Sequence, residues 1–182
     1  MMRSLSRKKL LAICTLAWAL GCDEMGSVDQ GRVIAFDKDK GTVTFIRDKS
    51  AQRDKPDYSF LPPVTYQIPE DLAEMGPVPK AGQRMQLDIL GKQITIFDSA
   101  TQTFKTIPYT LLEQKENVEK GDPLVTGKEF PLVDPANRTV TIYSGRQKTL
   151  VTFGLPEEYF ALPPETWAAG DEVRVYYREP GE

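Results

Sequence analysis

Two pairs of neighbouring carboxylates have the plainest capacity for chemistry in this chain. Glu70 and Asp71 form one pair and Glu157 and Glu158 the other, and each pair follows a proline. Two carboxylates with well-separated pKa values can act as general acid and general base, as in glycan hydrolysis. Adjacent acids at the start of a helix more often stabilise the helix by interacting with its dipole, and they aid solubility. An enzyme that acts through carboxylates would need a deep pocket where these four residues and Asp37 meet.

Metal and cofactor chemistry has little support in the sequence. The chain has no histidine, which removes the commonest general base and the commonest metal ligand. Copper would need soft ligands, and Met25, Met75 and Met85 are not paired at ligand spacing. The segment Asp37–Gly41 begins like a calcium loop, but Thr42 stands where an EF-hand has glycine. We therefore expect neither a metal nor a cofactor.

The first 22 residues have the pattern of an export signal that ends at a cysteine. Four basic residues precede the apolar run Leu10–Leu20, which is too short for a transmembrane helix of about 20 residues. The end of this run, ALGC, resembles the lipobox of bacterial lipoproteins, although Ala19 and Leu20 look exchanged. The resemblance implies cleavage between Gly21 and Cys22 and acylation of Cys22. The alternatives are an uncleaved anchor and an ordinary signal with an incidental cysteine.

The resemblance also implies where the mature protein would reside. Asp23 after the cysteine is similar to an inner-membrane retention signal, and the outer membrane stays an alternative. Loss of residues 1–21 removes four of the 23 basic side chains and none of the 26 acidic ones, which leaves a net charge of −7. That charge argues against a nucleic-acid partner. Cys22 would be the only cysteine left, so no intramolecular disulfide can form.

One six-residue turn recurs three times along the chain. Each copy starts with aspartate, ends with threonine and has an apolar residue on either side: Asp37–Thr42 (DKDKGT), Asp98–Thr103 (DSATQT) and Asp134–Thr139 (DPANRT). An aspartate at the start of a turn can accept hydrogen bonds from backbone N–H groups two or three residues later. The flanking runs of Val, Ile, Phe and Thr predict strands. We therefore expect three copies of one β-hairpin.

A longer duplication surrounds the first and third hairpins. The strand Val64–Tyr66 and the following Pro-Glu segment recur 87 residues later, and AGQRMQL, starting at Ala81, recurs as AGDEVRV 88 residues later. Each unit is therefore predicted to run hairpin, third strand, one helical turn after Pro-Glu, and fourth strand. The order resembles small OB-like or SH3-like barrels, including periplasmic copper chaperones, which implies a fold but no activity.

The predicted fold class is all-β, with two tandem small OB-like or SH3-like β-barrel units after the signal. The boundaries are a signal peptide at 1–21, a lipidated tether at 22–30, a first β-barrel unit at 31–113, a linker at 114–126 and a second β-barrel unit at 127–182. We expect the two units to share an apolar interface, because a unit of about 55 to 60 residues is marginal alone. The middle hairpin, at 93–112, could complete the first barrel.

The first unit also carries an insertion, residues 49–63, that the second unit lacks. Tyr58, Phe60 and Leu61 among its prolines could form a partner-binding lip. The alternative is that these side chains pack back on the barrel.

The lipobox, Gly31–Asp48 and LPPVTY at Leu61–Tyr66 also resemble an uncharacterised family of small predicted lipoproteins from sulfate-reducing bacteria. That resemblance implies no activity. We expect a non-enzymatic binding or scaffolding module of the cell envelope, held on the bilayer through Cys22 and facing the periplasm, with an unidentified envelope protein as partner. A carboxylate-dependent enzyme acting on envelope glycan and a small-ligand carrier are the alternatives.

Overall fold

The computed structural model describes residues 26–50, 52 and 55–177, and Gly21, Cys22 and Asp23 lie outside that range. The regular secondary structure of the described residues is β-strand with a few 3₁₀ turns, which confirms the predicted all-β fold class. Its strands are β1 (Ser27–Asp37), β2 (Thr42–Arg47), β3 (Phe60–Gln67), β4 (Arg84–Asp88), β5 (Gln93–Asp98), β6 (Thr103–Pro108), β7 (Thr110–Lys115), β8 (Leu132–Asp134), β9 (Thr139–Ser144), β10 (Thr149–Gly154) and β11 (Glu172–Tyr177). The helical elements are the 3₁₀ turns η1 (Leu72–Glu74), η2 (Glu157–Ala161) and η3 (Pro164–Trp167).

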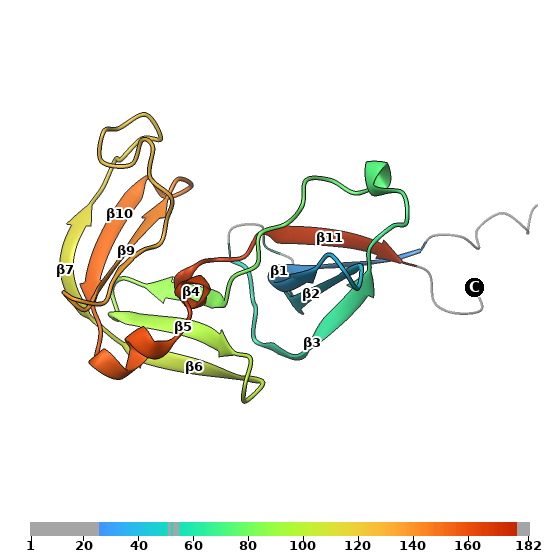
Figure 1. Cartoon of the computed structure of the whole chain (residues 1–182), viewed down its shortest axis with the longest axis horizontal. Helices are drawn as coiled ribbons and strands as arrows, with labels where there is room; N and C mark the ends of the chain where they lie inside the picture. Colours follow the sequence, from blue (N-terminus) through green and yellow to red (C-terminus); the bar gives the residue numbers. More distant parts are fainter. Residues whose placement is uncertain (1–25, 51, 53–54, 178–182) are drawn as a thin grey trace, which may run out of the picture.

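The strands form three antiparallel sheets that make up two lobes (Figure 1). The four-stranded lobe is one sheet in the order β11-β1-β2-β3. The two-sheet lobe packs the sheet β7-β10-β9-β8 against the sheet β4-β5-β6, with η2 and η3 beside them. In the four-stranded lobe, β3 and β11 are the two edges, and the rings of Tyr66 and Tyr177 meet with centroids 5.1 Å apart. The sheet therefore curls toward a barrel shape.

The repeated six-residue turn forms as predicted. In each copy the first and last residues face one another across the hairpin: Asp37 with Thr42, Asp98 with Thr103 and Asp134 with Thr139. The aspartate Oδ1 accepts hydrogen bonds from backbone N–H groups two or three residues later. The residue before the threonine has a positive φ in every copy: Gly41, Gln102 and Arg138.

Two more hairpins have the same turn geometry with other end residues, which the sequence pattern did not reveal. Asp88 faces Gln93, and its Oδ1 accepts from the N–H of Gly91 at 2.8 Å. Ser144 faces Thr149, and its Oγ accepts from the N–H of Gln147 at 3.3 Å. A short polar acceptor at the first position is therefore sufficient, and the final threonine is dispensable. The three sheets are built on variants of one hairpin.

The last strand joins the lobe at the other end of the sequence. β11 pairs with β1 in a continuous register from Ser27 opposite Tyr177 to Arg32 opposite Glu172 (Figure 1). The structure differs here from the predicted division, in which β11 would close the unit at 127–182. It also places β4 to β7 with the second unit's strands, and the middle hairpin β5–β6 does not complete the first barrel. The predicted tether to residue 30 is shorter, because Ser27–Gln30 belong to β1.

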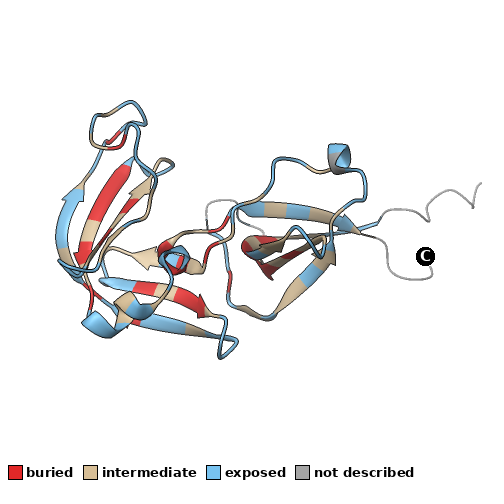
Figure 2. Ribbon diagram, viewed as in Figure 1, coloured by how far each residue is buried: buried red, intermediate tan, exposed pale blue. Residues whose placement is uncertain are grey.

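Apolar side chains form a core in each lobe, a cluster between the lobes and a smaller cluster around Val118, Val125 and Leu150. In the two-sheet lobe, buried residues on β5, β9 and β10 gather around the fully buried Trp167 of η3 (Figure 2). The four-stranded lobe is centred on Val33, Val43 and Phe45. Between the lobes, a further cluster joins Ile34 and Ile46 of β1 and β2 to Phe97 of β5. All residues of this cluster belong to the predicted first unit. The apolar contact between the two predicted units is instead the core of the two-sheet lobe, where Ile94 and Ile107 of the middle hairpin pack with Phe153.

Two duplicated segments cross where the chain passes between the lobes. The Ala-Gly dipeptides of the repeat, at Gly82 and Gly170, lie side by side: a Cβ added at Gly82 would be 2.7 Å from the backbone N of Gly170. The N–H of Gly82 donates to the carbonyl of Val33 at 3.1 Å, and the N–H of Val33 donates to the carbonyl of Asp171 at 2.9 Å. These hydrogen bonds hold the segment before β11 and the segment before β4 against β1 at Val33.

Candidate binding cleft between the lobes

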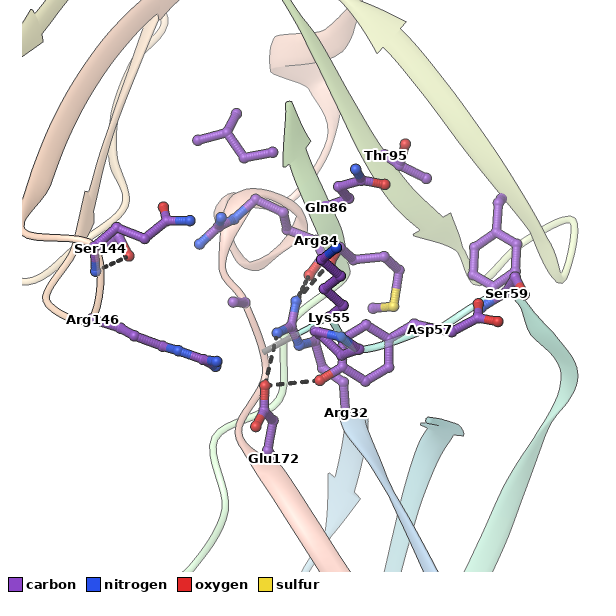
Figure 3. A pocket seen from close by; sticks show the side chains of 17 residues that line it. Arg32, Lys55, Asp57, Ser59, Arg84, Gln86, Thr95, Ser144, Arg146 and Glu172 are labelled. Carbon is purple, nitrogen blue, oxygen red and sulfur yellow. Dashed lines mark hydrogen bonds and ion pairs between the residues drawn. The ribbon is translucent and has the colours of Figure 1, made fainter. Parts of the chain in front are cut away.

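A cleft of about 820 Å³ lies between the two lobes and is lined by residues from distant parts of the chain. The four-stranded lobe supplies its residues from β1, from the loop before β3 and from the start of β11. The two-sheet lobe supplies residues from β4, β5, β6 and the β9–β10 turn (Figure 3). The lining residues include the charged side chains of Arg32, Asp57, Arg84, Arg146 and Glu172 and the ring of Tyr58.

Arg32 on β1 ties the lobes together at the base of the cleft. Its Nη1 donates to the carbonyl of Met85 at 2.7 Å, and to that of Arg84 at 3.3 Å. Its Nη2 pairs with Glu172 Oε1 at 3.3 Å, and its guanidinium carbon lies 4.3 Å from the centre of the Tyr58 ring. Protein groups thus engage both Nη groups and one face of this guanidinium, whereas Nε is buried with no hydrogen-bond partner among the described residues. We regard Arg32 as structural.

Tyr58 closes the side of the cleft next to Arg32. It is 8% exposed and packs in the cluster between the lobes. Its hydroxyl donates to Glu172 Oε1 at 2.8 Å (Figure 3). Burial, with a smaller contribution from Glu172, raises the pKa of Tyr58 far above that of a free tyrosine, although Arg32 opposes the shift. The hydroxyl therefore stays protonated and acts as a donor at neutral pH.

Arg84 at the start of β4 is a second arginine on the cleft wall. Its Nε donates to the carbonyl of Trp167 at 3.0 Å, and its own N–H donates to the carbonyl of Ala168 at 2.9 Å. Burial lowers the pKa of Arg84 to about 10, and the like charge of Arg32 adds to the effect. Within the described residues no carboxylate forms an ion pair with Arg84. Among the residues that the structure describes, neither Nη group of Arg84 has a hydrogen-bond partner, and Arg84 lines the cleft.

The charge of the cleft is opposite to that of the whole chain. Arg32, Arg84, Arg146 and one lysine line it against the two carboxylates of Asp57 and Glu172, whereas the full chain has a net charge of −3. Arg146 reaches from the β9–β10 turn toward Arg32 and Glu172 (Figure 3). A concave surface of one sign concentrates ions of the other sign.

The side chains predicted to form a partner-binding lip pack back on the protein, which was the alternative interpretation. Tyr58 is buried as described above, and Leu61 packs against the same cluster between the lobes. The ring of Phe60 lies under two cations, with Arg47 4.2 Å and Lys49 3.7 Å from its centroid. Of the three, only Tyr58 lines the cleft. A role for this loop in partner binding stays a prediction.

The carboxylates with a potential catalytic role do not meet. Asp37 lies in the β1–β2 turn, where hydrogen bonds from Lys40 lower its pKa instead of raising it. Glu70 and Asp71 are exposed before η1, while Glu157 and Glu158 are exposed on η2. None of the five lines the cleft. Among the described residues, no group of three or more His, Cys, Asp or Glu is placed to hold a metal.

Of the cleft residues named above, sequence reasoning identified only Tyr58, although the duplication contained a signal for others. When AGQRMQL is aligned with AGDEVRV, Arg84 stands opposite Glu172. These equivalent positions carry opposite charges, and both line the cleft. Opposite charges at matched repeat positions therefore mark the place where the two copies meet. Arg32 and Arg146 had no comparable signal, since each reads as an ordinary basic residue on a strand or turn.

A comparison with protein families shows the family to which this chain belongs. The model of a domain of unknown function, DUF4881, matches residues 24–182. The chain belongs to that family. No curated protein and no solved structure matches it. In the part that the structure describes, none of the helices has the length and apolar character needed to cross a bilayer. The match covers both lobes, so the DUF4881 domain includes β11, which pairs with β1, and the cleft.

Proposed function

We propose that this DUF4881 chain is a bacterial lipoprotein, anchored in the cell envelope by acylation of Cys22 and facing the periplasm. The basic n-region, the short apolar run and Gly21-Cys22 support the anchor. Multiple acyl chains would hold the protein on the bilayer, since a single chain gives only marginal binding. Asp23 favours the inner membrane over the outer. The described residues begin at Gly26, so the first strand lies a few residues from the anchor.

We propose further that the mature protein is a non-enzymatic binding module whose working surface is the cleft between the lobes. The observation that carries this proposal is the meeting of side chains from β1, β4, the β9–β10 turn and β11 around one concavity. Binding sites favour concave surfaces with a few convergent polar groups, often between two structural units. The partner is a component of the envelope, such as a protein presented to the cleft.

The rival functions draw less support from the geometry. A glycan enzyme would need carboxylates gathered in a pocket, whereas Asp37 and the two acidic pairs that follow prolines are spread over turns and 3₁₀ segments. A carrier would need space inside a lobe, but the interior of the two-sheet lobe is filled by Trp167, Phe153 and their neighbours. The binding module requires neither arrangement.

Membrane fractionation tests the anchor. Wild-type protein should appear in the membrane fraction with a labelled acyl group, and Cys22→Ser should lose the label and become soluble in the periplasm. A Cys22→Ser protein that stays in the membrane would favour an uncleaved signal and contradict the lipoprotein assignment.

In-cell photocrosslinking tests the working surface. A photoreactive residue at Gln86, which lines the cleft, should give a discrete crosslinked product. The same residue at Lys38, exposed in the β1–β2 turn outside the cleft, should not. Equal products from both positions, or products from Lys38 alone, would contradict the assignment.

A further inference from the structure

We propose that the cleft binds an oxyanion group, a phosphate or a carboxylate, through the guanidinium of Arg84. This inference deepens the proposed function, because it names the chemistry by which the binding module would recognise its ligand. The observations that carry it are the end of Arg84, which has no partner among the described residues, the sign of the charges around it and the cleft that it lines.

Arg84 is held in position by bonds that leave its charge uncompensated. One bond, from Nε to the carbonyl of Trp167, orients the plane of the guanidinium, and β4 together with the Gly82 crossing fixes its backbone. A cation removed from water is costly unless a counter-charge or several acceptors replace the solvent. Within the described residues, the charge that affects the pKa of Arg84 is that of another arginine, Arg32, which lowers it further. An anionic ligand would supply the missing counter-charge.

The remaining donors of Arg84 suit an oxyanion. With Nε occupied, the two Nη groups present parallel N–H donors, which match the two oxygens of a carboxylate or two oxygens of a phosphate. Arginine is preferred to lysine for such bidentate contacts because its fork is planar and preorganised. Arg32 cannot take this role, since Met85, Glu172 and Tyr58 already engage it.

The neighbours of Arg84 favour an anion at the same place. Arg146 reaches into the cleft from the β9–β10 turn of the same lobe, and Lys55 lines the cleft from the loop before β3. The two carboxylates that line the cleft already accept hydrogen bonds from the protein. Asp57 accepts from the N–H of Ser59 at 3.0 Å, and Glu172 accepts from Arg32 and Tyr58. Both are therefore engaged by groups other than Arg84.

A nuclear magnetic resonance titration tests the proposal on the chain from residue 22 onward with Cys22→Ser. Inorganic phosphate and acetate are added separately at constant ionic strength, and amide shifts are followed. We expect saturable shifts at cleft residues such as Met85 and Thr95 with at least one probe. Shifts with phosphate alone would identify a phosphoryl ligand, and shifts with acetate alone would identify a carboxylate ligand. No saturable shift with either probe would overturn the proposal.

Variants distinguish a specific site from general attraction to cations. Arg84→Gln should weaken binding roughly 10- to 100-fold, because it removes a bidentate charge-assisted contact. Lys38→Gln removes one charge from an exposed turn and should leave affinity unchanged. If Arg84→Gln does not fold, the exposed Arg146→Gln supplies the test and should weaken binding several-fold. Equal affinity of the wild type and the cleft variant would overturn the assignment.

Failure of this inference is separable from failure of the proposed function. A crosslink from Gln86 in cells, combined with no response to either anion, would refute the anion and leave the binding module intact. The absence of a crosslink from Gln86, together with a specific anion response, would retain the site and refute the protein partner.

Discussion

Replacing Gly170 with alanine should destabilise the protein strongly although glycine there has an ordinary backbone conformation. A Cβ at this position would lie 1.8 Å from the carbonyl oxygen of Val33 and 3.1 Å from the N of Gly82. Real Cβ contacts are essentially never shorter than 3.0 Å, so the crossing segments must separate by more than 1 Å. Because the atoms it meets belong to the backbone, no side-chain rotation can relieve the clash.

The magnitude follows from what that separation would break. Overpacking of a well-packed site costs about 1–3 kcal/mol. The displaced carbonyl of Val33 also accepts the N–H of Gly82, and one weakened hydrogen bond adds about 1 kcal/mol. We therefore expect Gly170→Ala to lower the free energy of unfolding by about 3 kcal/mol. For a chain of this size, that corresponds to a fall in Tm of about 6–12 °C.

Urea unfolding and thermal melting provide the assay, and Gly121→Ala provides the matched control. An added Cβ at Gly121 meets nothing within 4 Å, so this variant should lie within about 0.5 kcal/mol of the wild type. If Gly170→Ala were as stable as Gly121→Ala, the close crossing of the duplicated segments would be wrong.

Three further substitutions probe the contacts between the lobes and the turns. Phe97→Ala, at a ring only 1% exposed between the lobes, should cost about 3–5 kcal/mol in urea unfolding, and a loss below about 1 kcal/mol would mean that the cluster is not packed. Tyr58→Phe should cost about 1 kcal/mol because it removes the bond to Glu172, and an unchanged unfolding midpoint would exclude that bond in solution. Backbone hydrogen bonds from Ala100 and Thr101 lower the pKa of Asp98 below its ordinary 3.8, so its carboxylate stabilises the folded state above that pH and loses this effect as the pH falls through the lowered value. The stability advantage of wild type over Asp98→Ala should therefore shrink in acid, and an advantage that grew as the pH fell would contradict the sign.

The hairpins could be predicted from sequence because their determinants are local. A polar acceptor at the first position of the turn and a positive φ at the fifth reverse the chain within six residues. The aspartate, the threonine and the flanking apolar residues could be read from the sequence. The prediction required aspartate and threonine together, and for that reason it missed the turns that begin at Asp88 and Ser144. The physical requirement is a polar acceptor, which several residue types can supply.

The partner of the last strand could not be predicted from the duplication. A repeat indicates that two segments are equivalent, but it does not indicate which strand each segment pairs with. Either β1 or β8, the corresponding first strand of the second unit, could pair with β11. The choice depends on tertiary contacts that are not encoded near β11, chiefly the fit of Gly170 against Val33 and Gly82. The cleft was missed for the same reason, since it exists only once β11 crosses to the other lobe and brings Glu172 beside Arg32.

The pairing of β11 with β1 is the claim on which the cleft and both proposals depend, and a disulfide tests it most directly. Val28 and Tyr176 are exposed and stand opposite one another, and facing residues of antiparallel strands lie within disulfide range. In the chain from residue 22 with Cys22→Ser, which has no other cysteine, Val28→Cys with Tyr176→Cys should oxidise within the monomer. A control pair, Leu132→Cys with Tyr176→Cys, places one thiol on β8 and should stay reduced. Oxidation of the control pair instead, or crosslinking only between molecules, would contradict the pairing of β11 with β1 within one chain.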